Sequence, residues 1–146
     1  MATVYDVAKY ILEKHGEMTA MKLQKLVYYS QAWHLAWEEE PLFNEKIEAW
    51  VNGPVCPDLY KIHSGQFKVN SSLLDLYGTT NNLSQEQKES IDNVLGFYGD
   101  KSSQWLSDLT HAEEPWKKAR EGLEQSERGN REIDLSSMFE YYNSLQ

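Results

Sequence analysis

The residues with the clearest capacity for chemistry lie in the segment THAEEPW, where His111 stands two and three residues before Glu113 and Glu114. A histidine beside carboxylates can bind a metal ion or transfer a proton, so a small metal-dependent hydrolase using His111 and Glu113 is one hypothesis. The same turn can instead make local hydrogen bonds, with Thr110 or His111 capping a helix that begins at Pro115. We favour this structural interpretation.

The only cysteine, Cys56, is a second candidate, because a thiol paired with a distant histidine could act as a nucleophile. A reactive thiol requires electropositive surroundings, yet the nearest charged residues in the sequence are Asp58 and Lys61. A single cysteine forms no internal disulfide and holds no structural zinc by itself. We therefore predict a buried, unreactive side chain and a reducing, cytoplasmic compartment.

The remaining motifs give no further indication of catalysis. None of the four histidines stands in HExxH or in a zinc-finger spacing, and His34 lies in an aromatic segment where a core position is the simpler interpretation. The sequence contains no GxSxG, no GxxxxGK[ST] and no GxGxxG motif. We predict a protein that is not an enzyme and that uses no cofactor and no metal.

The segment EAWVNGPVCPDLYK is the most unusual stretch of the chain. A short β element is expected near residues 46–55, because apolar and polar side chains alternate there. Asn52 and Gly53 tolerate a positive φ, whereas Pro54 and Pro57 fix φ near about −65°. The segment therefore predicts a rigid corner that serves a surface and carries no reactive group.

The first two helices follow from caps and apolar periodicity. The first is expected from about Thr3 to His15, closed by Gly16. Thr19 is the expected N-cap of a longer second helix, which Pro41 must end. This second helix is apolar on nearly every side, so we predict that it is the buried centre of the domain. We expect Lys22 and Lys25 to mark its exposed beginning.

Further helices are expected along the rest of the chain. One begins at Pro57, and another has a capping box of Ser84 and Gln87 and ends at Gly99. Ser102 or Ser103 caps a helix that directs Trp105, Leu106 and Leu109 inward, and Pro115 begins the next one. The last helix docks on the core through Met138, Phe139, Tyr142 and Leu145. Residues 67–82 are expected to form a loop with a brief strand pair or one helical turn.

Composition and charge limit the function further. The chain has 146 residues, of which 40% are hydrophobic and 12% aromatic, so we expect one domain over residues 1–146. The fold class is mainly α (α+β), a compact domain of about five to seven helices around a buried central aromatic helix. The formal charge of −9 disfavours nucleic acid as a partner. No apolar run reaches the roughly 20 residues of a membrane-spanning helix, so we expect no membrane association.

Four motifs in order resemble the SocA-like family, also called the Panacea antitoxin domain, which includes the GepA-type phage-associated proteins. These motifs are MKLQKLVYYSQAWHLA, PLFNEKIEAWVNGPVCPDLY, LSDLTHAEEPWKKAR and IDLSSMFEYY. The resemblance implies a prokaryotic or prophage protein that neutralises a toxin by direct binding. One family member is described as a proteolytic adaptor to the Clp protease, and others as plain inhibitors of varied toxins. Some members carry an added N-terminal DNA-binding segment, whereas this chain begins directly at its first helix, so autoregulation through DNA is not expected.

The expected partner is therefore a cognate protein toxin. The Clp protease is a further partner if the chain acts as an adaptor, and homo-oligomerisation is left open. A solo phage-encoded inhibitor of a host defence or housekeeping protein is the alternative function. For Trp50 we favour packing under the turn over a role as a partner anchor, although tryptophan suits both. The residues that carry the family motifs and form the candidate partner surface are Lys22, Lys25, Tyr29, Trp50, Asn52, Gly53, Pro54, Val55, Tyr60, His111, Pro115 and Trp116.

Overall fold

The computed structural model describes residues 2–146 and has the predicted mainly α architecture with short two-stranded sheets. Its α-helices are α1 (Val4–His15), α2 (Ala20–Glu38), α3 (Pro57–His63), α4 (Gln85–Tyr98), α5 (Ser103–Ala112), α6 (Glu114–Ala119) and α7 (Leu135–Ser144). Its strands are β1 (Met18–Thr19), β2 (Glu48–Trp50), β3 (Gly53–Val55) and β4 (Lys68–Val69). No helix within residues 2–146 is long and apolar enough to cross a membrane.

Side-chain caps fix where the main helices begin. The Thr3 and Ser84 hydroxyls accept from backbone N–H groups three residues on, and both belong to capping boxes. Thr19 and Ser102 cap α2 and α5 in the same way. These bonds satisfy N–H groups that have no partner inside a helix, which is why the predicted starts of these helices are confirmed.

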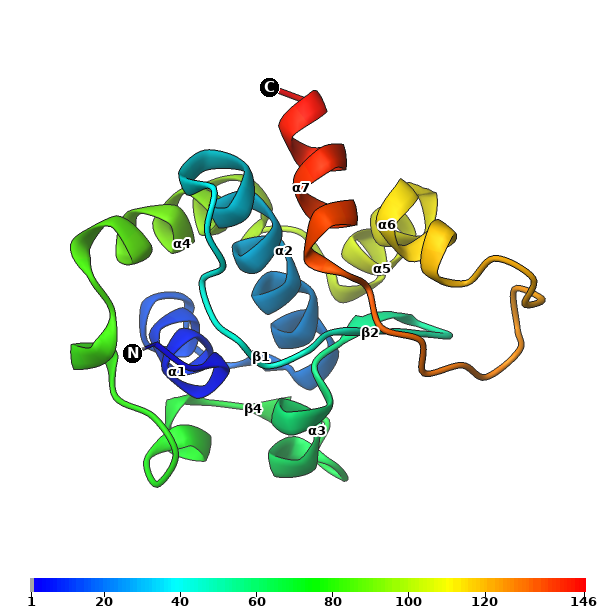
Figure 1. Cartoon of the computed structure of the whole chain (residues 1–146). Helices are drawn as coiled ribbons and strands as arrows, with labels where there is room; N and C mark the ends of the chain where they lie inside the picture. Colours follow the sequence, from blue (N-terminus) through cyan, green and yellow to red (C-terminus); the bar gives the residue numbers. More distant parts are fainter. Residues whose placement is uncertain (1) are drawn as a thin grey trace.

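Helix α2 is the centre of the molecule, as Figure 1 shows, with α1, α4, α5 and α7 packed around it. Fourteen of its nineteen residues are buried. Its tyrosines join the packing directly: the Tyr29 ring stacks on Tyr98 of α4 with centroids 4.2 Å apart, and Tyr28 meets Tyr142 of α7 edge to face. The predicted buried aromatic helix is confirmed.

The two small sheets fix the chain on either side of the α2 N-terminus. Strand β1 pairs antiparallel with β4, and β2 pairs antiparallel with β3 in a hairpin. A returning segment lies along the outer edge of β2, since Ala49 N–H donates to Arg131 O and Ile133 N–H donates to Ile47 O, each at 2.8 Å. The predicted β element is therefore a hairpin with a third, irregular segment beside it.

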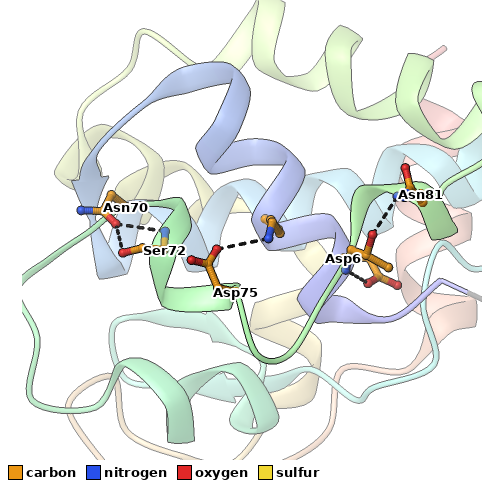
Figure 2. Close-up of polar contacts among 7 residues, drawn as sticks. Asp6, Asn70, Ser72, Asp75 and Asn81 are labelled. Atoms are coloured by element: carbon orange, nitrogen blue, oxygen red, sulfur yellow. Dashed lines mark hydrogen bonds and ion pairs between the residues drawn. The ribbon is translucent and has the colours of Figure 1, made fainter.

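Residues 67–82 contain strand β4 and two short 3-10 helices, η1 (Ser71–Leu74) and η2 (Thr80–Asn82). Figure 2 shows this segment running beside α1. The Asn70–Ser72 turn and Asp75 lie toward one end of the view, and Asp6 of α1 lies toward the other end. The Lys9 ammonium lies 3.2 Å from the Asp75 carboxylate. The buried Asp6 carboxylate accepts from Thr79 N–H at 2.8 Å. The loop is thus fixed to α1 by polar contacts.

The structure corrects four expectations about individual side chains. Lys25 does not mark an exposed beginning of α2, because its exposed fraction is 0%. Trp105 and Leu145 do not point into the core and are 41% and 52% exposed. Neither Thr110 nor His111 caps α6: the Thr110 hydroxyl donates to a carbonyl within its own helix, and Glu113 is the N-cap, without a side-chain bond.

Candidate functional site

The corner after the hairpin is held by the side chain of Gln24, on α2. Its Oε1 accepts from Cys56 N–H at 2.9 Å, and its Nε2 donates back to Cys56 O at 3.3 Å. The same Nε2 lies 2.9 Å from His63 Nε2, which must therefore accept and be unprotonated. Burial lowers the pKa of His63, in agreement with a neutral ring. One buried amide thus joins α2 to both ends of α3, its N-cap Cys56 and its last residue His63.

The next residue, Lys25, extends beneath the hairpin itself. Its Nζ donates to Pro54 O at 3.3 Å. A Cβ placed on Gly53 would lie 2.5 Å from Lys25 Cε, and Gly53 has φ +120°. Glycine is required at this position for two reasons: the backbone conformation, and the close approach of the lysine. The predicted positive φ at Gly53 is confirmed.

Helices α5 and α6 clamp the hairpin turn from its other side. Three side chains donate to three successive hairpin carbonyls: Trp116 Nε1 to Trp50 O at 2.8 Å, His111 Nε2 to Val51 O at 2.8 Å, and Ser107 Oγ to Asn52 O at 2.7 Å. The His111 ring also packs edge to face on Trp116. Three side-chain hydrogen bonds therefore hold the turn, and His111 makes one of them.

A groove runs along this corner and is called the hairpin groove below. It consists of two adjoining depressions of about 600 and 710 Å³ that share Met21, Asn52 and Tyr60. Its lining comes from segments 19–25, 50–55, 60–67, 103–111 and 128–130. Phe67, at 76% exposed, is its most exposed aromatic residue.

The charge of the hairpin groove differs from that of the molecule. No Asp or Glu is among the residues that line it within the described chain, and its Lys and Arg residues are Lys25 and Arg128. A depression elsewhere, between α2 and α4, is lined by Glu38, Glu86, Glu89 and Asp92. In a chain with a formal charge of −9, the lining of this groove is thus free of acidic side chains.

Lys25 is the unusual member of this groove. Burial lowers the pKa of its ammonium from 10.5 to about 7. Among residues 2–146, no carboxylate lies within ion-pair distance of its Nζ. A buried charge without a partner is costly to the folded state. The structure therefore holds, under the floor of the groove, a lysine whose charged form has no negative partner.

A second polar cluster joins α2, α6 and α7 in the core. The Glu113 carboxylate accepts from the Tyr29 hydroxyl at 2.7 Å and from the Tyr142 hydroxyl at 2.8 Å, and Tyr142 lies 3.0 Å from Tyr28. Burial raises the pKa of Glu113, and the two tyrosine hydrogen bonds oppose that effect. This cluster holds α7 against the core and explains why Glu113 and Tyr142 are buried polar residues.

The hydrolase hypothesis gains no support from this geometry. The His111 ring meets the hairpin and Trp116, whereas the Glu113 carboxylate meets tyrosine hydroxyls in the core. No three His, Cys, Asp or Glu side chains form a metal-ligand group in the part of the chain that the structure describes. Cys56 is 1% exposed, and burial raises the pKa of its thiol to about 11, as expected of an unreactive cysteine.

The structure divides the predicted surface residues into three groups. Six of them line the hairpin groove: Lys25, Trp50, Asn52, Val55, Tyr60 and His111. Four support the groove or the adjoining core from behind: Tyr29, Gly53, Pro115 and Trp116. Of the other two, Pro54 supplies the carbonyl that Lys25 binds, and Lys22 lies away from the groove, where its Nζ donates to Gly99 O at 2.7 Å.

Trp50 both packs and lines the groove. Its indole lies edge to face on the Tyr60 ring with centroids 4.9 Å apart, and its Nε1 donates to Glu48 at 2.9 Å. Its side chain is half-buried. Trp50 thus packs from the hairpin onto α3, and the choice between packing under the turn and anchoring a partner stays a prediction.

Sequence reasoning missed three residues that shape this region. Gln24 and His63 form the buried joint of the corner, and Arg120 donates to Ala49 O at 3.0 Å and to three carbonyls of the following loop. One signal was present for Gln24 and Lys25: both lie in a helix that is apolar on nearly every side. Polar residues within such a helix are expected to be buried and paired.

Comparison with known proteins gives one family. Residues 23–117 match the family model described as antitoxin SocA-like, Panacea domain, which covers more than half of the chain. A search of the curated proteins and of the solved structures found no match. The matched residues run from α2 to α6 and include most of the hairpin groove.

Proposed function

This chain belongs to the antitoxin SocA-like, Panacea domain family, and we propose that it neutralises a cognate protein toxin by binding it directly. The family membership supports an antitoxin-type role in general. The proposal adds the mechanism, in which a cytoplasmic complex blocks the toxin without any chemical step by the antitoxin.

The observation that carries this proposal is the hairpin groove. The hairpin, α3 and α5 contribute to its lining, six of the family-motif residues line it, and the exposed Phe67 ring lies beside the half-buried Trp50 and Tyr60 rings. Grooves with aromatic walls and a few convergent polar groups suit recognition of another chain, since aromatic residues dominate interface energetics. We propose this groove as the toxin-binding surface.

The test is co-expression with the product of the neighbouring open reading frame. The expected result is rescue of growth by this chain, together with co-purification of the two proteins. If the neighbour is toxic and this chain gives neither rescue nor a complex, the proposal is wrong.

The same assay separates two mechanisms within the proposal. Rescue that persists in a strain lacking the Clp protease supports simple occlusion of the toxin. Rescue that disappears only in that strain supports a proteolytic adaptor. A gene without a toxic neighbour would favour the alternative function, an inhibitor of a host protein.

A further inference from the structure

Lys25 has more hydrogen-bonding capacity than the protein uses. Its ammonium has three N–H donors, and Pro54 O, at 3.3 Å, is its one acceptor among the described residues. The side chain is completely buried and lines the larger depression of the hairpin groove. Buried charges in proteins are normally paired, so this site lacks a negative group.

The surrounding elements do not supply that group. Apart from Lys25, the titratable residues that line the larger depression are Tyr60 and His63 from α3 and His111 from α5, and Arg128 lines the adjoining one. His63 is a neutral acceptor of the Gln24 amide, and His111 Nε2 donates to the hairpin. None of these four residues is a carboxylate.

The size and lining of the groove limit which kind of negatively charged group could pair with Lys25. The larger depression, of about 710 Å³, is within the roughly 300–1,000 Å³ of typical ligand sites. Among the residues that line it, Lys25 is the one Lys, Arg, Asp or Glu side chain, so its floor presents a single amine and no carboxylate. A polyanion or phosphate normally requires several cationic or N–H donors. One ammonium suits a single carboxylate.

We propose that the hairpin groove binds a carboxylate carried by a segment of the partner toxin, and that this carboxylate pairs with Lys25. The inference rests on the proposed function for the identity of the partner. The carboxylate is either an Asp or Glu side chain or the C-terminus of the bound chain, and the rest of the segment is uncharged where it meets Tyr60, Phe67 and Asn52.

The test uses three short peptides as probes, each titrated into the isotope-labelled full chain and followed by NMR. They are acetyl-Gly-Glu-Gly-amide, acetyl-Gly-Gly-Gly with a free C-terminus, and the neutral acetyl-Gly-Gln-Gly-amide. We expect saturable shifts of the Lys25, Asn52 and Gly53 amides with at least one carboxylate peptide and none with the neutral one. Whichever carboxylate peptide binds identifies a side chain or a terminus. Absence of saturable shifts with both overturns the proposal.

Variants make the test specific. Lys25→Met keeps the approximate length of the side chain and removes its charge. We expect the variant to bind the carboxylate peptide at least about 30-fold more weakly than the wild type. Asn52→Asp places a carboxylate at the exposed turn of the groove, and we expect several-fold weaker binding. Asn93→Asp, the same change on the exposed surface of α4, is the matched control and leaves binding unchanged. Unchanged binding by both groove variants contradicts the proposal.

Binding of the toxin itself distinguishes this inference from the proposed function. If the wild-type chain and Lys25→Met bind the toxin equally, the antitoxin function stands and the carboxylate site is wrong. If the chain binds carboxylate peptides through Lys25 but binds no toxin, the site stands and the proposed function fails.

Discussion

Replacing Lys25 with methionine is predicted to stabilise the folded protein at pH 7. The pKa of Lys25 falls from 10.5 to about 7 on folding, and one pKa unit corresponds to about 1.4 kcal/mol. The buried ammonium therefore costs about 4 to 5 kcal/mol. Methionine removes this cost but leaves Pro54 O without its hydrogen bond, which costs about 1 to 3 kcal/mol. The expected net gain in unfolding free energy is about 1 to 4 kcal/mol.

The sign of the pH dependence follows from proton binding. Between about pH 7 and pH 10 the unfolded chain keeps the Lys25 proton and the folded protein releases it. The wild-type protein therefore becomes more stable, relative to Lys25→Met, as the pH rises through this window. Below about pH 7 both states are protonated and the full cost remains. Tyr60, His63 and His111 face the same groove and are present in both proteins. The Lys25 charge adds to the lowering of the His63 pKa, so Lys25→Met also removes that smaller effect.

Chemical denaturation at about pH 6, 8 and 9.5 measures this difference. Lys61→Met is the control, because Lys61 is exposed, and its stability should follow that of the wild type at each pH. The advantage of Lys25→Met should be largest at about pH 6 and should shrink toward pH 9.5. A variant that is less stable than wild type at every pH, or an advantage that does not change with pH, would refute the argument that Lys25 carries an uncompensated charge.

Three further predictions concern the elements that hold the groove and the core. Gly53→Ala should lower the unfolding free energy by about 1 to 3 kcal/mol or more, because Gly53 has a positive φ and lies close to Lys25. The control Gly122→Ala, also at a positive φ but in open space, should lower it by about 1 kcal/mol. Denaturant titration measures both changes. Tyr142→Phe removes a hydrogen bond to a buried carboxylate and should cost about 1 to 3 kcal/mol in the same assay, while the half-buried neighbour Tyr141→Phe should change stability by less than about 0.5 kcal/mol. Arg120→Met should speed amide hydrogen exchange in the loop that follows it by about tenfold, and unchanged exchange would show that the arginine does not order that loop.

Much of the fold could be predicted because its signals are local. Thr3, Thr19, Ser84 and Ser102 cap helices through bonds to N–H groups three residues away. Such bonds depend on a few adjacent residues, so the sequence displays them directly. The buried central helix was predictable for a similar reason, since its apolar residues occupy every side.

The misplaced side chains depend on contacts between distant segments. Lys25 is buried because the hairpin, about thirty residues later, folds over it. Trp105 has the correct period to face inward, but it lies at the exposed start of α5, where the Lys101 ammonium is 5.0 Å from its ring. Leu145 comes after the last residue of α7 and has no element above it. Periodicity predicts which face of a helix is apolar, but it does not predict which elements pack against that face.

The candidate site was predictable in part. The family motifs identified twelve candidate residues, and six of them line one groove. Its chemistry was not predictable, because the role of Lys25 depends on the absence of acidic groups in five separate segments. That absence is visible only once the segments have been brought together.

The most direct test of the account is binding of the neighbouring gene product by the purified chain and by Lys25→Met, compared at equal folded concentration. We predict a stable complex and growth rescue for the wild type and for Lys61→Met, and loss of both for Lys25→Met despite its equal or greater stability. A Lys25→Met variant that binds and protects as well as the wild type would contradict the role of the hairpin groove. Protection by the wild type without any complex would contradict direct neutralisation itself.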